Sequence, residues 1–167
     1  MRHNSFLNQF KKNAVVLSVG CGPGIIEKRM QEIRKDLYII SLDVNRNMLS
    51  TFLFFLNLIH GDGQCVPFTS ESFNAALCIT SLEFMVNPER TIKETYRILK
   101  NHGLFMALFL NPKSRYIQQK TLNSIQGSVI RLFDKMETQA DLFIENNEIV
   151  EQPSNDTARL IIMKAIK

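Results

Sequence analysis

The chain is poor in cysteine and has no long apolar or basic run. Its three cysteines, Cys21, Cys65 and Cys78, lie far apart without the spacing of metal ligands, which is typical of small buried residues in a reducing compartment. The most apolar stretch, 48–59, is much shorter than a membrane span, and residues 1–12 lack the apolar core of a signal peptide. These absences predict a cytoplasmic protein with no metal and no membrane partner.

The charge pattern argues against nucleic acid as a partner. The net charge is +4, but the lysines and arginines are scattered, and aromatic side chains do not alternate with basic ones as a stacking surface requires. With 167 residues, 45% of them apolar and 22% charged, the composition is that of one globular domain. We expect this domain over 14–167, after a short N-terminal segment, 1–13. A homodimer is kept open as an expectation, and the sequence does not decide the oligomeric state.

Apolar runs alternate with helical patterns, which predicts a parallel sheet covered on both faces. The first five runs predict strands at 14–19, 37–42, 57–60, 73–80 and 103–110. Two later runs, 141–150 and 159–166, are joined by a loop too short for a crossover, so we expect them to pair antiparallel at one edge. The predicted fold class is α/β, a doubly wound, Rossmann-like, seven-stranded mixed sheet with an antiparallel C-terminal strand pair.

Helical patterns lie between the strands. The first predicted helix begins near Gly24 and has an apolar stripe of Ile25, Ile26, Met30 and Ile33. A second, strongly apolar helix is expected from Asn45 to about Leu56.

The third predicted helix has the clearest ends. It runs from Pro88 to about Lys100, because Asn87 favours an N-cap and Gly103 a helix end. Its expected apolar stripe is Ile92, Thr95, Tyr96 and Leu99. The residues expected to face solvent are Lys93, Glu94, Arg97 and Lys100.

The segment Gly20-Cys21-Gly22-Pro23-Gly24 directly follows the first strand and precedes the first helix. Closely spaced glycines at such a turn let a ligand approach the backbone, and this predicts a nucleotide-type cofactor site. Asp43 supports the prediction, because it follows the second strand, where a ribose would lie. The third glycine comes one position too early for a dinucleotide fingerprint, and no Lys-Ser or Lys-Thr pair follows as in a P-loop.

Five segments, in the same order, resemble the motifs of class I S-adenosylmethionine-dependent methyltransferases, of the type 11-like, small-molecule kind. The segments are 15–24, 42–43, 60–68, 72–84 and 97–104. The likeness covers roughly 14–112, and it implies S-adenosyl-L-methionine as the cofactor.

The resemblance also implies roles for single residues near the cofactor. The backbone of the glycine loop would pass under the methionine part of the cofactor, with Gly20, Cys21, Gly22 and Gly24 as binding residues. Asp43 would accept hydrogen bonds from both ribose hydroxyls.

Further roles concern the base and the reacting end. Asp62 would accept from the adenine amino group, and Gly63 would offer its N–H to the ring. Val44 and Met48 would enclose the purine. The sulfonium and the incoming acceptor would lie beside Thr80 and Ser81.

Several of these residues have simpler interpretations. Asp43 could cap the helix that starts near Asn45, and Asp62 could be an ordinary turn residue between two glycines. Cys21 is assigned no thiol chemistry. Glu83, after the fourth strand, is interpreted as solvated rather than catalytic, and His102 as structural.

Two departures from the family pattern carry expectations of their own. Ser18 stands where an acidic residue usually lies near the amino group of the cofactor, so we expect that polar contact to be weaker. The short segment 1–13 predicts either an open site or a lid formed by Phe6, Leu7 and Phe10.

The predicted function is methyl transfer to a small-molecule acceptor by in-line displacement. The acceptor pocket is expected from the N-terminal segment, the turn 81–85 and the stretch 111–130, where Arg115 and Tyr116 are candidates for contact. No catalytic base is identified. The alternative is a catalytically inactive, methyltransferase-like binding or partner subunit, and a nicotinamide oxidoreductase is a remote third interpretation.

Overall fold

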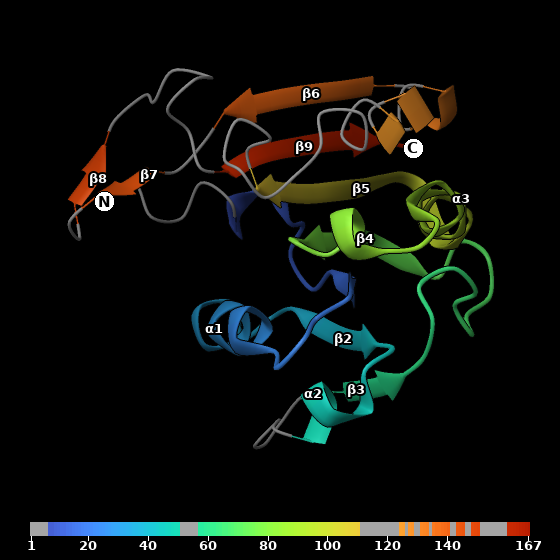
Figure 1. Ribbon diagram of the computed structural model, residues 1–167, viewed down its shortest axis with the longest axis horizontal. Coiled ribbons are helices and arrows are strands. Elements are labelled where there is room, and N and C mark those ends of the chain that lie inside the picture. Colours follow the sequence, from blue (N-terminus) through green and yellow to red (C-terminus); the bar gives the residue numbers. More distant parts are fainter. Residues whose placement is uncertain are drawn as a thin grey trace.

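The computed structural model describes residues 7–50 and 57–110 and, beyond these, 124–125, 127–128, 131–133, 135–140, 143–145, 148–150 and 160–167. Its main sheet has the strand order β3-β2-β1-β4-β5-β9-β6 (Figure 1). Five strands are parallel: β1 (Val15–Val19), β2 (Tyr38–Asp43), β3 (Asn57–His60), β4 (Phe73–Ile79) and β5 (Leu99–Leu110). β9 (Leu160–Ile166) is antiparallel to β5, and β6 (Lys135–Ala140) is antiparallel to β9.

The parallel strands follow from their composition. β1, β2 and β4 are buried almost throughout, as runs of apolar residues in the middle of a parallel sheet must be. The chain moves outward from β1 to β2 and β3 and then returns to place β4 on the other side of β1. The strand order therefore reverses between β1 and β4, and ligands of doubly wound sheets bind at such a switch point, outside the carboxyl ends of the strands.

The sequence-based prediction of the C-terminal pair is partly wrong. β9 does pair antiparallel with its neighbours, but its outer partner is β6 and not the run 141–150. Within that run, β7 (Phe143–Glu145) pairs with β8 (Glu148–Val150) in a separate two-stranded sheet. Glu145 lies opposite Glu148, so β7 and β8 pair with each other and the run is not one long edge strand.

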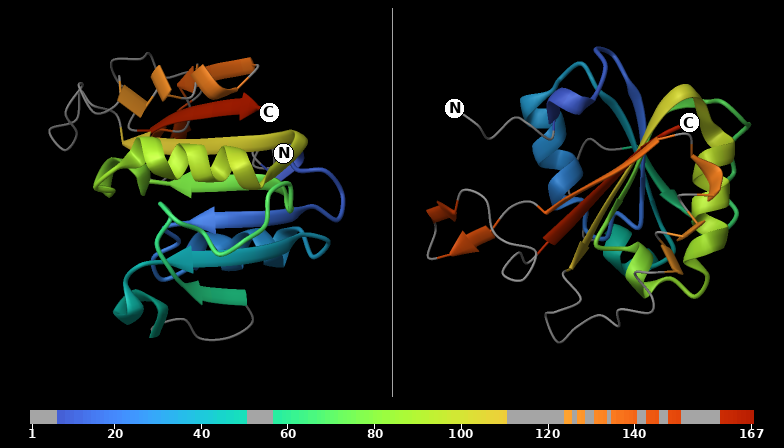
Figure 2. Two further views of the ribbon diagram at one scale, coloured as in Figure 1. Left: turned by 90° about the vertical axis from the view of Figure 1, so that its right-hand side faces the viewer. Right: turned by 90° about the horizontal axis from the view of Figure 1, so that it is seen from above.

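The helices cover both faces of the sheet. Figure 2 shows α1 (Ile25–Ile33) on one face and α3 (Pro88–Ile98) on the other. α2 (Arg46–Ser50) is the described part of the second predicted helix, and two short 3-10 turns, η1 (Leu7–Gln9) and η2 (Leu82–Phe84), complete the order. None of the helices in the part of the chain that the structure describes has the length and hydropathy needed to cross a bilayer.

The apolar stripe predicted for α1 is wrong in three of its four members. Met30 is buried, but Ile25, Ile26 and Ile33 are exposed, and the second buried side chain of the helix is that of Glu27. The helix is short and meets the sheet along a narrow contact. The apolar periodicity of its sequence therefore does not predict which side chains are buried.

α3 begins as predicted and ends earlier. The side chain of Asn87 accepts from the N–H of Arg90 at 3.0 Å, which confirms the N-cap. The helix stops at Ile98 because β5 already begins at Leu99. Ile92 and Thr95 of the predicted stripe are buried, whereas Tyr96 is only partly buried.

The N-terminal segment packs into the core. Leu7 and Phe10 are buried in a cluster with Ala14, Val16 and Met30. The guanidinium of Arg34 donates to the Leu7 carbonyl at 2.7 Å and so fixes this segment beside the end of α1. Leu7 and Phe10 are therefore not available as a lid, and Phe6 lies outside the described residues.

Candidate cofactor site

The glycine loop lies against the ends of β2 and β4. The N–H groups of Gly20 and Cys21 both donate to the Leu42 carbonyl, at 2.7 and 3.2 Å. Gly20 has a φ of +73°, and a Cβ at this position would lie 2.6 Å from the Cβ of Ser81. Glycine is therefore required at Gly20, both for its backbone conformation and for its contact with the residue after β4.

Gly22 differs from Gly20 in its surroundings. Its φ is also positive, at +55°, but a Cβ built there meets nothing within 4 Å. The space beside Gly22 is thus open in the part of the chain that the structure describes. A ligand can approach the loop from this side without meeting a side chain of the described residues.

Asp43 is the last residue of β2, and its carboxylate holds the glycine loop. Its Oδ2 accepts from the Gly22 N–H at 2.7 Å, and its Oδ1 accepts from the Asn45 N–H at 2.7 Å. The N-cap of α2 is Asn45, whose side chain accepts from Asn47 and Met48, so Asp43 is not the residue that caps this helix. A carboxylate has about four acceptor positions, so each oxygen of Asp43 can accept a further hydrogen bond from a ligand.

The end of β4 forms the other wall of the switch point. The Ser81 hydroxyl donates to the Val19 carbonyl at 2.8 Å, which ties β4 to β1. Thr80 has a φ of +44°, although a β-branched side chain disfavours the left-handed region. Its N–H is held by the Leu108 carbonyl at 2.8 Å. Such strained residues cluster at functional sites, and Thr80 directly precedes Ser81, which contacts Gly20 of the loop.

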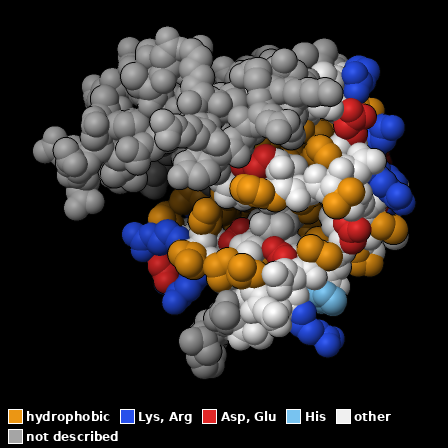
Figure 3. Space-filling view, in the orientation of Figure 1, with side chains coloured by type: hydrophobic (Ala, Val, Ile, Leu, Met, Phe, Trp, Pro, Cys, Tyr) orange, Lys and Arg blue, Asp and Glu red, His pale blue; other side chains and the backbone are white. Residues whose placement is uncertain are grey.

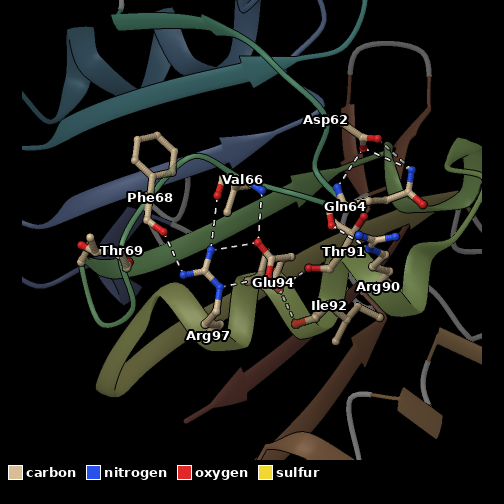
Figure 4. A network of polar contacts seen from close by, with 12 residues as sticks. Asp62, Gln64, Val66, Phe68, Thr69, Arg90, Thr91, Ile92, Glu94 and Arg97 are labelled. Carbon is tan, nitrogen blue, oxygen red and sulfur yellow. Dashed lines mark hydrogen bonds and ion pairs between the residues drawn. The ribbon is translucent and has the colours of Figure 1, made fainter.

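The loop after β3 brings Asp62 and Gly63 to the same edge. Gly63 is buried, and a Cβ there would lie 2.6 Å from Cγ1 of Val19. Asp62 is exposed, and its Oδ1 accepts from the Gln64 N–H at 2.8 Å (Figure 4). Asp62 thus has the turn role that the sequence left open, and its remaining acceptor positions face solvent.

Arg97 and Glu94 hold the chain that follows Asp62. Arg97 forms a two-bond ion pair with Glu94, with both N···O distances at 2.9 Å, and also donates to the Phe68 carbonyl at 2.8 Å (Figure 4). Glu94 in turn accepts from the Val66 N–H at 3.1 Å. The prediction that both side chains face solvent is therefore wrong, because backbone groups of a distant loop bind them.

The charges of two carboxylates act on Cys21. Burial, together with the negative charges of Glu27 and Asp43, raises the pKa of the Cys21 thiol to about 12. The thiol is therefore protonated at neutral pH and is no nucleophile, as we expected. Burial also raises the pKa of Glu27 above its usual value. Sequence reasoning missed Glu27, although an acid in the apolar run Ile25-Ile26-Glu27 was a signal for it.

The structure brings most of the predicted site residues together. Gly20, Ser81 and Gly63 meet around Val19, and Cε of Met85 lies within 3.6 Å of the Cβ positions of both glycines. Gly24 is buried and precedes α1 with a φ of +66°.

Of the remaining predicted residues, Val44 and Met48 are exposed, and others lie outside the described residues. Residues 111–123, including Arg115 and Tyr116, lie outside the described residues. Among the described residues, no group of three or more His, Cys, Asp or Glu could hold a metal ion.

Comparison with known proteins identifies the family. The model of a methyltransferase domain family, Methyltransf_11, matches residues 17–107. The uncharacterized protein MJ0638 of Methanocaldococcus jannaschii is 31% identical over 140 residues, which cover 84% of this chain and 57% of that protein. Demethylmenaquinone methyltransferase of Symbiobacterium thermophilum is 26% identical over 129 residues, which cover 70% of this chain and 51% of that protein. The chain thus spans little more than half the length of these relatives.

Solved structures share the fold. A methyltransferase dependent on S-adenosylmethionine from Archaeoglobus fulgidus has a TM-score of 0.77 at 14% identity, and the match covers 99% of this chain and 91% of that one. A Haloferax volcanii methyltransferase, solved with the Trm112 methyltransferase activator, has a TM-score of 0.70 at 17% identity, covering 99% and 90%.

A doubly wound sheet with a glycine loop after its first strand and a carboxylate after its second is the architecture of class I S-adenosylmethionine-dependent methyltransferases. This chain belongs to the methyltransferase domain family that matches residues 17–107. The cofactor that the family and the fold imply is S-adenosyl-L-methionine.

The residues present fit that cofactor. The open side of Gly22 leaves room for a ligand against the loop, and Asp43 keeps acceptor positions for a diol. The two buried carboxylates suit a ligand that carries a sulfonium and an ammonium group, and they oppose a pyrophosphate at the start of α1.

Proposed function

We propose that the protein transfers a methyl group from S-adenosylmethionine to a small-molecule acceptor by in-line displacement. The observation that carries the proposal is the meeting of the glycine loop, Asp43 and the end of β4 at the switch point of the sheet. The activity belongs to the whole protein, of which the described domain provides the cofactor site.

The adenosine half of the cofactor is assigned to the ends of β2 and β3. Asp43 is buried and oriented by two backbone N–H groups, so it accepts from the ribose hydroxyls without reorganisation. Asp62 accepts from the adenine amino group, and Gly63 offers a backbone N–H to the ring. The exposed side chains of Val44 and Met48 enclose the purine from the solvent side.

The methionine half is assigned to the glycine loop, over Gly20, Cys21, Gly22 and Gly24. Thr80 and Ser81 border the position of the reacting methyl group. The Thr80 N–H donates to the Leu108 carbonyl, and the Ser81 hydroxyl donates to the Val19 carbonyl. When bound, the cofactor supplies an activated methyl group on a positively charged sulfur. The task of the protein is to align the acceptor with this group and to exclude water, and no general base is assigned.

An apolar acceptor fits the surroundings of the site best. Large hydrophobic side chains beside the glycine loop and the β4 turn are exposed, with Ile25 at 72%, Phe84 at 70% and Val86 at 96%. Figure 3 shows acidic side chains among hydrophobic ones in the middle of the molecule. Two relatives are named for demethylmenaquinone and for 2-methyl-6-phytyl-1,4-hydroquinone. We therefore propose an acceptor with an apolar body.

Calorimetry followed by product analysis tests this function. We expect S-adenosylmethionine to bind with one site per chain, and S-adenosylhomocysteine to form when a suitable apolar acceptor is added. Binding without product across a panel of acceptors would support the inactive subunit instead. No binding of either compound would contradict both interpretations.

A further inference from the structure

Glu27 has one carboxylate oxygen that nothing in the described structure uses. The residue is 2% exposed, although charged side chains are rarely buried this fully without a partner. Its Oε1 accepts a hydrogen bond of 2.5 Å from the Ser18 hydroxyl. Its Oε2 is buried and has no hydrogen-bond partner among the described residues. A buried acceptor without a partner is costly, so its presence calls for an explanation.

The charges that act on Glu27 do not provide a partner. The side chain lies in the first turn of α1, where the helix N-terminus favours a negative charge, and its own backbone N–H supports it. The other nearby charge is that of Asp43, which repels it. The helix N-terminus thus explains why an acid is tolerated here, but it does not explain why Oε2 is left without a donor among the described residues.

The position of Glu27 points to the cofactor. Glu27 lies between the two elements that the glycine loop joins, because it is in the first turn of α1 and its Oε1 accepts a hydrogen bond from Ser18 of β1. Its charge and that of Asp43 both act on the Cys21 thiol within the loop. Asp43 lies on the side assigned to the ribose. The methionine part, which carries an ammonium group, is assigned to the glycine loop, and Oε2 of Glu27 is a buried acceptor without a described partner on the residues that flank this loop.

We propose that Glu27 binds the ammonium group of the methionine part of the cofactor through Oε2, with the Ser18 hydroxyl fixing Oε1. The inference rests on the proposed function and adds a cofactor-binding residue to it. It also revises the expectation that the contact with the amino group of the cofactor is weak because β1 has Ser18 in place of an acid. The acid is supplied by Glu27 of α1 instead. Ser18 is then the positioning residue of a serine–glutamate pair.

The pair also explains why position 18 is not acidic here. An Asp at that position would place a second carboxylate beside Oε1 of Glu27, where like charges repel and the hydrogen bond from Ser18 is lost. Ser18→Asp should therefore weaken cofactor binding when Glu27 is present and strengthen it in a variant that lacks Glu27.

Calorimetric binding of two ligands provides the test: S-adenosylhomocysteine and its analogue without the amino group. We expect Glu27→Gln to weaken binding of S-adenosylhomocysteine by about 10- to 100-fold, the range for a charged hydrogen bond. Binding of the deaminated analogue should change by less than about twofold, because Gln keeps the shape and only the charge is lost. Glu32→Gln, on the exposed side of the same helix, serves as the matched control and should change neither affinity.

The rescue variant completes the test. In the double variant Ser18→Asp with Glu27→Ala, we expect the preference for the amino-bearing ligand to return. Equal losses for both ligands in Glu27→Gln, or no loss for either, would overturn the assignment of Glu27 while leaving the cofactor site in place. If the wild-type protein bound neither ligand, the proposed function itself would fail. Thermal unfolding of each variant confirms that it is folded.

Discussion

Replacing Gly20 and Gly22 by alanine, one at a time, tests the geometry of the glycine loop. The two residues share the loop and the sign of φ, at +73° and +55°, so each alanine has to adopt a left-handed conformation. That alone costs about 1–2 kcal/mol. At Gly22 nothing else changes, because the new Cβ enters open space.

At Gly20, steric overlap with Ser81 lowers the free energy of unfolding further. The new Cβ would lie 2.6 Å from the Cβ of Ser81, a distance that forces the end of β4 to move. Such a shift breaks the hydrogen bond of 2.8 Å from Ser81 to Val19, which contributes about 1 kcal/mol, and overpacking adds about 1–3 kcal/mol. We therefore expect Gly20→Ala to lower the free energy of unfolding by about 3–6 kcal/mol, and Gly22→Ala by about 1–2 kcal/mol.

Urea denaturation followed by circular dichroism measures both values. The variant Gly20→Ala with Ser81→Gly removes the clashing Cβ, and we expect it to be more stable than Gly20→Ala alone. For the affinity of the cofactor site, Gly22→Ala should have the larger effect of the two substitutions, because the Cβ at Gly22 enters the space assigned to the cofactor. Gly22→Ala should therefore weaken binding of S-adenosylhomocysteine more than its small loss of stability suggests. Equal destabilisation by the two substitutions would refute the reasoning from the contact with Ser81.

Three further variants test separate parts of the account. Asp43→Ala should weaken binding of S-adenosylhomocysteine by about 1–3 kcal/mol in calorimetry, because two ribose hydroxyls lose their acceptor; unchanged affinity would argue against ribose binding. Arg97→Lys cannot form the two-bond pair with Glu94, so hydrogen exchange at the Val66 amide should become faster, and unchanged exchange would show that the pair does not hold the loop. Glu27→Gln should alter the dependence of stability on pH. Burial raises the pKa of Glu27 in the folded state. The contribution of the Glu27 side chain to the free energy of unfolding is therefore fully present below its usual pKa of 4.5 and is lost as the pH rises through its higher pKa in the folded state. The stability of Glu27→Gln relative to wild type, measured in urea, should thus increase from pH 4 to neutral pH, and a constant difference would contradict this.

The parallel half of the fold could be predicted because its signals are local. β1 and β2 are apolar runs that end in glycines and in Asp43, and a parallel sheet brings all such ends to one edge. The positions of Gly20, Asp43 and Ser81 followed from this rule without any knowledge of contacts.

The missed features depend on partners distant in sequence. Arg97 and Glu94 have the spacing of an exposed ion pair on a helix, and only the tertiary fold places the backbone of Val66 and Phe68 beside them. Glu27 interrupts an apolar stripe, and its burial depends on Ser18 of β1.

The C-terminal error has a different origin. The run 141–150 is as apolar as an edge strand, but it pairs with itself as β7 and β8. Strand propensity does not state the partner, so the choice of β6 as the neighbour of β9 was not available from the pattern.

A crystal structure of the protein with S-adenosylhomocysteine tests the central claim most directly. The account predicts the ribose hydroxyl oxygens within about 2.5–3.0 Å of the Asp43 carboxylate, the amino acid part over the glycine loop, and the ammonium nitrogen at Oε2 of Glu27. Electron density for the ligand at another edge of the sheet, or with its ribose away from Asp43, would contradict it.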